Sequence, residues 1–360
     1  MEDFKLKNVY SSEFVAKFAA LLKIIYPPFQ QDEFVQHVLD TSWEARELKE
    51  RMRHITVSLR KYLPSAYAEA LQILRHAAPQ CEGFPYLFFP DFVEQYGLEH
   101  EDISIPALEL FTQFSSAEFA VRPFIIKNPD TMMVQMLAWA EHPNHHVRRL
   151  ASEGSRPRLP WGMALKPFQR DPSPVLPILE RLKTDDSDYV RRSVANNLND
   201  IAKDHPNIVL EIAKRWKGSN PHTDWIIRHG LRTLLKRGNR EALALFNLHG
   251  AEGITIADLH FAVDSLAIGE STTFSFDVRT SQTMLIRLEY GVYYVKASGE
   301  ATRKVFFIHE KEYPANAVTR ITRKISFEQR TTRKHYAGKH RLCVIVNGVE
   351  SAETSVVLTS

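Results

Sequence analysis

The pattern of apolar residues changes once along the chain, near Gly250, and this change limits the possible folds more than any other feature. Before it, apolar residues recur at helical spacing in segments that prolines interrupt. After it come seven short runs that alternate between apolar and polar residues: LHFAVD, TTFSFDV, MLIRLEYGVYYV, KVFFIHEKEY, RKISFEQ, HRLCVIVNG and TSVVL. Such runs are typical of a β-sandwich. The sequence therefore predicts a helical domain over residues 1–250 and an all-β domain over residues 254–360.

The helical part contains a repeat. Early apolar segments cover residues 14–25, 34–39, 55–63, 67–74 and 108–114. From Met132 onward, MVQMLAWAEH leads into PNHHVRRLASEG, VLPILERLKTD into DSDYVRRSVANNLNDI, and IVLEIAKRWKG into SNPHTDWIIRHGLRTLLKRG. Aligning Arg149, Arg192 and Arg228 gives steps of 43 and 36 residues. This spacing predicts HEAT-like helix pairs in a solenoid; a helical array with no formal repeat is the alternative.

The β domain has features of an immunoglobulin-like sandwich. Tyr336 precedes a run in which Leu342, Val344 and Val346 alternate, as in the tyrosine corner of such folds. Asn347–Gly348 then predicts a tight hairpin turn. The two cysteines of the chain fall in different predicted domains, so we expect no disulfide and a reducing compartment, the cytoplasm. We find no signal-peptide pattern and no apolar window long enough to span a membrane.

Basic residues gather in two stretches of a chain whose net charge is only +3. The first holds Arg148, Arg149, Arg156, Arg158, Lys166 and Arg170 against one acid, Glu153. The second holds Arg320, Arg323, Lys324, Arg330, Arg333, Lys334, Lys339 and Arg341 against one acid, Glu328. Stretches of this kind indicate a polyanionic partner, and two solvated faces are the alternative.

The most informative segment is HPNHHVRRLASEGSRPRLPWG, residues 142–162. Arg149 and Glu153 are four residues apart and share a helix face. The helix is expected to end at Gly154, after which prolines force an extended connection that carries arginines and Trp161. Such a loop presents guanidinium groups and an indole to a ligand. Arg149 and Glu153 could instead be a surface ion pair, and Trp161 could fill a core position between repeats.

Two further acids join this segment. Asn196 aligns with Glu153 in the next repeat, and Asp200 follows it by four residues, so Glu153 and Asp200 are expected to line one surface. Asp200 could instead pair with Arg191 or Arg192. Upstream, SSAEFAVRPF contributes Glu118, which could also be a helix-start acid.

A cluster of histidines suggests a metal site only at first sight. His142, His145 and His146 lack the HExxH spacing and have no cysteine nearby. We therefore expect neither a metal nor another cofactor.

These strings resemble the AlkC-type DNA alkylation repair glycosylases, relatives of the AlkD group in the HEAT-like repeat superfamily. The resemblance covers residues 115–248 through SSAEFAVRPF, HPNHHVRRLASEGSRPRLPWG and SVANNLNDIAKDHP, and a C-terminal immunoglobulin-like extension is a known arrangement of the family. It implies hydrolysis of the N-glycosidic bond of cationic bases, chiefly 3-methyladenine and 3-methylcytosine, leaving an abasic site.

The resemblance also implies roles for individual residues. The catalytic candidates are Glu153, Asp200, Glu118 and Trp161, with Arg149 placing a carboxylate or phosphate. Contacts to double-stranded DNA are expected from Arg148, Arg149, Arg156, Arg158, Lys166, Arg192, Arg333, Lys334 and Lys339. No lysine stands out as a Schiff-base nucleophile, so we expect a monofunctional enzyme that works as a monomer. A non-catalytic repeat scaffold that binds DNA or a protein is the alternative function.

Overall fold

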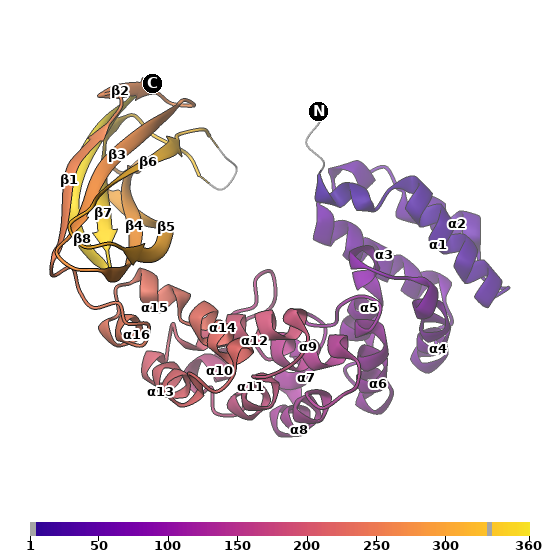
Figure 1. Ribbon diagram of the computed structural model, residues 1–360. Helices are drawn as coiled ribbons and strands as arrows, with labels where there is room; N and C mark the ends of the chain where they lie inside the picture. Colours follow the sequence, from indigo (N-terminus) through magenta and orange to yellow (C-terminus); the bar gives the residue numbers. More distant parts are fainter. Residues whose placement is uncertain (1–4, 330–332) are drawn as a thin grey trace. The chain divides into compact units, whose positions relative to one another are not determined.

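The computed structural model describes residues 5–329 and 333–360, with helices followed by strands (Figure 1). The helices up to the first repeat are α1 (Ser12–Ile25), α2 (Gln31–Val38), α3 (Leu48–Tyr62), α4 (Tyr67–Ala77), α5 (Phe88–Tyr96), α6 (Glu101–Thr112) and α7 (Arg122–Lys127). The later helices are α8 (Pro129–Trp139), α9 (His145–Gly154), α10 (Lys166–Arg170), α11 (Leu176–Leu182), α12 (Asp188–Ile201), α13 (Pro206–Trp216), α14 (Pro221–Gly230), α15 (Arg232–Lys236) and α16 (Arg240–Ala244). The strands are β1 (Ile254–Phe261), β2 (Ser265–Ala267), β3 (Ser271–Thr280), β4 (Met284–Val295), β5 (Ala301–Tyr313), β6 (Val318–Ser326), β7 (Gly338–Val346) and β8 (Val349–Thr359).

The chain folds into two compact units. The first comprises the described residues up to His205 together with Trp216–Gly230, and the second comprises Pro206–Arg215 and the described residues from Leu231 onward. The change from helix to strand falls where the sequence predicts it, between Ala244 and Ile254. The compact units do not divide there, because α15, α16 and most of α13 group with the strands.

Helix pairs build the first unit. α8 packs against α9, α11 against α12, and α12 contacts both α9 and α14, so equivalent helices of successive repeats lie side by side. The predicted HEAT-like repeat is therefore confirmed. Local sequence sets the helix starts: the Asn144 side chain accepts a hydrogen bond from the His146 amide at the start of α9, which satisfies a donor that the helix leaves unpaired.

The early helices match the periodic segments with two exceptions, the short α7 and α5. Pro85 and Pro90 suggest an interrupted segment, but α5 begins at Phe88 and places Pro90 in its first turn. Backbone amides of the first turn have no partner within the helix, so proline costs nothing there. α5 carries two acidic residues, Asp91 and Glu94, that line a pocket described below.

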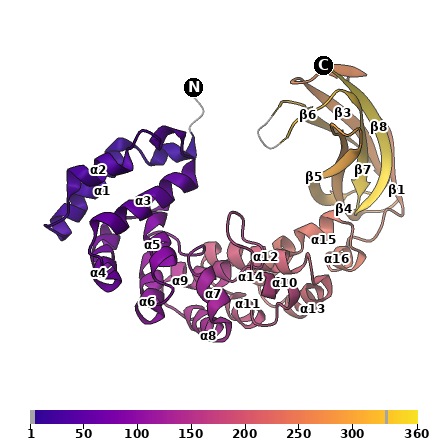
Figure 2. The ribbon, with the colours of Figure 1, turned by 180° about the vertical axis from the view of Figure 1, so that it is seen from behind.

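The second unit holds an immunoglobulin-like sandwich of two sheets (Figure 2). Strands β1, β3 and β6 form one sheet in that order, and β2, β8, β7, β4 and β5 form the other. Their alternating apolar side chains share one core that includes Phe274, Phe276, Leu342 and Val344. All seven predicted runs contribute to strands, and the short β2 was missed.

The hairpin turn that the sequence predicts after β7 is present in the structure. Asn347 and Gly348 join β7 to β8 with φ angles of 47° and 81°, as a two-residue hairpin requires. Tyr336 is 37% exposed and its backbone carbonyl bonds to the ring of the buried His340, and its tyrosine corner stays a prediction. Across the described ranges, none of the helices has the length and hydropathy that crossing a bilayer requires.

Candidate active site

The loop that follows α9 is held by an arginine that lies outside it. Arg122, at the start of α7, is fully buried and donates hydrogen bonds to the backbone carbonyls of Gly154, Arg156 and Met163 at 2.8, 2.8 and 2.5 Å. Burial lowers the pKa of Arg122 to about 10, so the side chain remains charged at neutral pH. One guanidinium therefore fixes both ends of the loop that carries Trp161.

Small polar residues bring α9 and α12 close together. Ser193 on α12 donates to the hydroxyl of Ser152 at 2.9 Å, and Asn197 donates to the Ser152 carbonyl at 2.8 Å. These side chains are buried, and short residues let the two helix backbones approach. As a result Glu153 at the end of α9 faces Asp200 near the end of α12.

Three acids and three bases form a continuous chain of ion pairs. Arg149 lies 3.1 Å from Glu118 and 3.6 Å from Glu153. Arg156 lies 2.6 Å from Glu153 and 2.8 Å from Asp200, and Lys203 lies 2.9 Å from the other oxygen of Asp200. Charges thus alternate from Glu118, the negative end, to Lys203, the positive end.

The middle of this chain of ion pairs is buried, which strengthens the attraction between its charges. The side chains of Asp200 and Glu153 are 2% and 7% exposed. Burial alone would lower the pKa of Arg156, but the adjacent carboxylates of Glu153 and Asp200 raise it above its usual value. The pKa of Arg149 is raised in the same way by Glu118 and Glu153 against the effect of burial. Both guanidinium groups are therefore permanently charged.

The negative end of the chain meets a pocket of about 420 Å³. Glu118 lines this pocket with His146 from α9, Tyr189 from α12, Phe119 and Trp161. The ring of Tyr189 lies over the guanidinium of Arg149, 4.7 Å from its carbon, and helps to orient it. Burial, followed by the charges of His145 and Arg149, lowers the pKa of His146, which favours its neutral form. The pocket thus combines the carboxylates of Glu118 and the exposed Glu82 with aromatic walls.

Trp161 is presented to solvent by its backbone. Its φ angle is 65°, in the left-handed region that residues other than glycine rarely adopt, and its side chain is 65% exposed. The loop is closed beneath it by a hydrogen bond from the Leu165 amide to the Pro157 carbonyl at 3.1 Å. Trp161 therefore does not fill a core position between repeats. An exposed indole on a strained backbone is typical of a ligand site.

The same geometry decides how the acids of the ion-pair chain are partnered. Arg149 and Glu153 are not a surface pair, because their side chains are 13% and 7% exposed. Asp200 pairs with Arg156 and Lys203, and not with Arg191 or Arg192.

Several of the arginines expected to contact DNA are engaged within the protein. Arg156 is buried between two carboxylates, and Arg149 is nearly so. Arg148 donates two hydrogen bonds to the carboxylate of Asp185, at 2.6 and 3.1 Å, and this pair joins two successive repeats. These three guanidinium groups are paired with carboxylates and do not form a free basic surface, and their contact with DNA stays a prediction. Arg158 is more open but pairs with Asp204 at 2.7 Å.

The remaining predicted cations are accessible to different degrees. Arg192 pairs with Asp188 at 2.6 Å and stays 64% exposed, and Lys166 is exposed at the start of α10. In the sandwich, Lys334 and Lys339 are exposed, whereas Arg333 lies over the ring of Tyr294 at 4.8 Å. Arg330 of the same stretch lies outside the described residues.

Lys49 was missed because it lies far away in the sequence. It extends from α3 and donates a hydrogen bond to the carbonyl of Trp161, 112 residues further on. Arg122 was also assigned no role from the sequence. An arginine that donates only to backbone carbonyls has no acidic partner whose position in the sequence could indicate the contact. Among residues 5–329 and 333–360, no group of three or more His, Cys, Asp or Glu side chains is placed to hold a metal ion.

The fold and the site define a class of two-domain proteins. In this class, helical repeats carry a buried chain of ion pairs beside an exposed tryptophan, and an immunoglobulin-like domain follows them. A family model described as the C-terminal Ig-like domain of the uncharacterised protein YhaZ matches residues 255–360. The chain is 50% identical over 343 residues to the uncharacterized protein YhaZ of Bacillus subtilis, covering 95% of this chain and 96% of that protein. It also matches the structure of the Pseudomonas fluorescens alkylpurine DNA glycosylase AlkC bound to DNA containing an abasic site analog. That match has a TM-score of 0.95 and 38% identity, over 99% of this chain and 100% of the other. The chain belongs to the AlkC family.

Proposed function

We propose that this protein is a DNA glycosylase that removes cationic alkylated bases, such as 3-methyladenine and 3-methylcytosine, and leaves an abasic site. One observation carries the proposal: the carboxylate end of a buried ion-pair chain opens into an aromatic pocket beside Trp161. The likeness over the whole chain to AlkC, an alkylpurine DNA glycosylase, supports the same reaction class.

The chemistry suits such a site. An N3-alkylated base already carries a positive charge, so the C1′–N bond can break with its electron pair going to the base, which leaves neutral. The sugar becomes oxocarbenium-like, and a water adds to C1′ with loss of a proton. A fixed carboxylate stabilises this developing charge without any need for a strong general acid.

We assign a role to each acid by whether its side chain lines the pocket. Glu118 lines the pocket and would stabilise the sugar and orient the water. Glu153 and Asp200 lie behind it and would fix the carboxylate through Arg149 and Arg156. The indole of Trp161 would pack on the lesion nucleotide, where cation–π attraction contributes roughly 0.5–2 kcal/mol.

DNA binding would rest on the accessible cations. Lys166 and Arg192 in the repeats and Lys334 and Lys339 in the sandwich are the exposed candidates, and each phosphate contact makes binding more salt-dependent. We expect one protein molecule per lesion and no strand cleavage without alkali. Both cysteines are free and buried, and the cytoplasm is the compartment that we propose.

The test is base release from a duplex oligonucleotide with one 3-methylcytosine or 3-methyladenine, followed by alkaline cleavage. Glu118→Gln and Glu153→Gln are compared with the wild type, and Glu82→Gln, at the rim of the same pocket, is the matched control. We expect at least 100-fold slower release in the first two and near wild-type release in the control. A wild type that binds lesion DNA but releases neither base would refute the proposal and favour a non-catalytic scaffold.

A further inference from the structure

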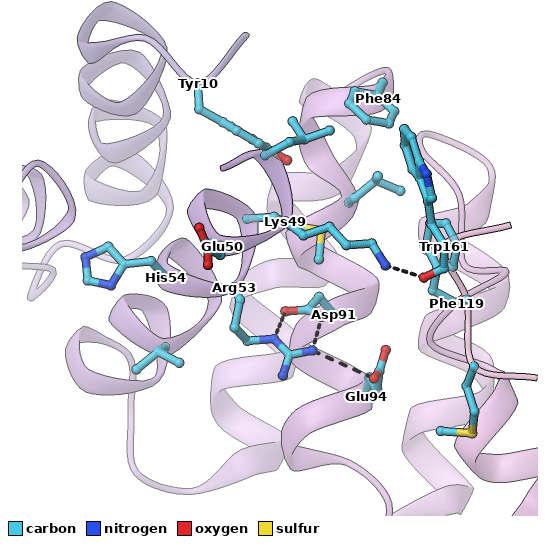
Figure 3. Close-up of a pocket in the computed structure, with 16 residues that line it drawn as sticks. Tyr10, Lys49, Glu50, Arg53, His54, Phe84, Asp91, Glu94, Phe119 and Trp161 are labelled. Atoms are coloured by element: carbon cyan, nitrogen blue, oxygen red, sulfur yellow. Dashed lines mark hydrogen bonds and ion pairs between the residues drawn. The ribbon is translucent and has the colours of Figure 1, made fainter. Parts of the chain in front are cut away.

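A second pocket lies on the other side of Trp161. It has a volume of about 560 Å³ and is walled by α3, α5 and the Trp161 loop (Figure 3). Phe84, Leu87, Phe119 and Trp161 line both this pocket and the one that contains Glu118. The two cavities therefore share an aromatic wall.

The walls of the second pocket are apolar side chains that the fold leaves exposed. Val57 is 46% exposed, Phe84 40%, Met163 51% and Trp161 65%. Single exposed apolar residues are ordinary, but four that converge on one cavity are typical of a ligand site. Aromatic rings on one wall favour a flat partner that can stack on them.

The polar lining of the pocket includes two carboxyl groups that Arg53 holds, those of Asp91 and Glu94. Arg53 donates to both oxygens of the buried Asp91, at 2.9 and 2.8 Å, and lies 3.8 Å from Glu94 (Figure 3). Burial, and then the charge of Asp91, raises the pKa of Glu94 to about 7. The Glu94 carboxyl is thus able to accept hydrogen bonds and, when protonated, to donate one.

The Lys and Arg side chains that line the pocket, Lys49 and Arg53, each have a partner within the protein. The Arg53 guanidinium is bound by Asp91, and Lys49 donates to the Trp161 carbonyl while lying over the Phe119 ring at 5.0 Å. A phosphate would also meet the carboxyl groups of Glu50, Asp91 and Glu94, which line the same pocket. A neutral planar ring with amino and imino groups at its edge matches both the aromatic wall and the carboxyl groups.

We propose that this pocket binds a free nucleobase, namely the base that the adjacent site releases. This inference rests on the proposed glycosylase function. The base would stack on Trp161 and Phe84 and place its exocyclic amino group on Glu94, since both oxygens of Asp91 accept from Arg53. Excision would then leave the base on the protein after the abasic DNA has gone, and added free base would inhibit turnover.

The experiment is calorimetric titration of the full chain with 3-methyladenine, without DNA. Val57→Trp fills the pocket from an exposed position, and Glu94→Gln keeps its shape but removes the ionisable group. Val134→Trp, on a residue that is 72% exposed on α8 and outside the pocket, is the matched control. We expect saturable binding to the wild type and to Val134→Trp, and at least a tenfold weaker Kd in Val57→Trp.

The outcomes separate this inference from the glycosylase proposal. Base release from DNA without measurable binding of free base, or with equal binding by Val57→Trp, overturns the inference and leaves the glycosylase intact. Binding that Val57→Trp abolishes supports the pocket even if no base is released from DNA. Displacement of the base by inorganic phosphate overturns the assignment to a nucleobase. Circular dichroism confirms that each variant is folded.

Discussion

Arg156 offers the sharpest test of the buried ion-pair chain, through Arg156→Met. The substitution keeps the apolar stem and removes the charge that joins Glu153 at 2.6 Å to Asp200 at 2.8 Å. Removing one partner of a buried pair typically costs about 3–5 kcal/mol, because the other charge stays buried. Arg149 still lies 3.6 Å from Glu153 and Lys203 2.9 Å from Asp200, so we expect the lower end, about 3 kcal/mol.

Urea unfolding followed by tryptophan fluorescence measures this loss. All five tryptophans lie in the first compact unit, so the signal reports the unit that holds the chain of ion pairs. Arg158→Met is the control, because Arg158 and Asp204 form an open pair worth less than about 1 kcal/mol. Combining Arg156→Met with Glu153→Gln and Asp200→Asn should restore part of the lost stability, since no buried carboxylate is then left without its arginine.

The result that would refute this reasoning is a loss in Arg156→Met no larger than in Arg158→Met. Arg156 would then be a solvated side chain available to DNA, as the sequence alone suggests. A triple variant less stable than Arg156→Met would refute the electrostatic explanation, because packing would then account for the loss.

Three further outcomes follow from the site. Trp161→Ala should change the free energy of unfolding by less than about 1 kcal/mol, since the indole is 65% exposed, yet slow base release at least tenfold in single-turnover assays. Gly154→Ala should cost about 1–3 kcal/mol in urea unfolding, because its methyl would lie 2.7 Å from Val121 at the end of α9; no loss would show that the helices can shift. Glu94 has a raised pKa of about 7 against 4.5, so the wild type should lose stability as the pH rises from about 4.5 to 7 while Glu94→Gln does not. The variant should therefore gain about 2–3 kcal/mol relative to the wild type by pH 8, and a pH-independent difference between the two unfolding free energies would contradict the burial of this carboxyl.

Local sequence accounts for most of the elements. The repeat helices α8, α9, α11 and α12, the end of α9 at Gly154 and the turn at Asn347–Gly348 depend on periodicity, capping and turn chemistry within a few residues. α5 was missed because proline in a first turn resembles a break. Glu153 and Asp200 stand out by their positions in the repeats and Glu118 by the upstream string SSAEFAVRPF, and the structure brings the three into one chain of ion pairs.

What the sequence alone determined is the order of the two kinds of structure, the repeat, and which acids and which tryptophan share a region. Only the tertiary structure decided which partner each charged side chain has. Arg156 meets Asp200 across 44 positions, and Lys49 reaches Trp161 across 112. A sequence shows the sign of a side chain, whereas its burial and its partner depend on helices that pack only in the folded state. For that reason Arg156, which the sequence assigns to DNA binding, pairs with buried carboxylates in the folded protein. For the same reason the chain up to the end of α3 supplies half of the residues that line the second pocket.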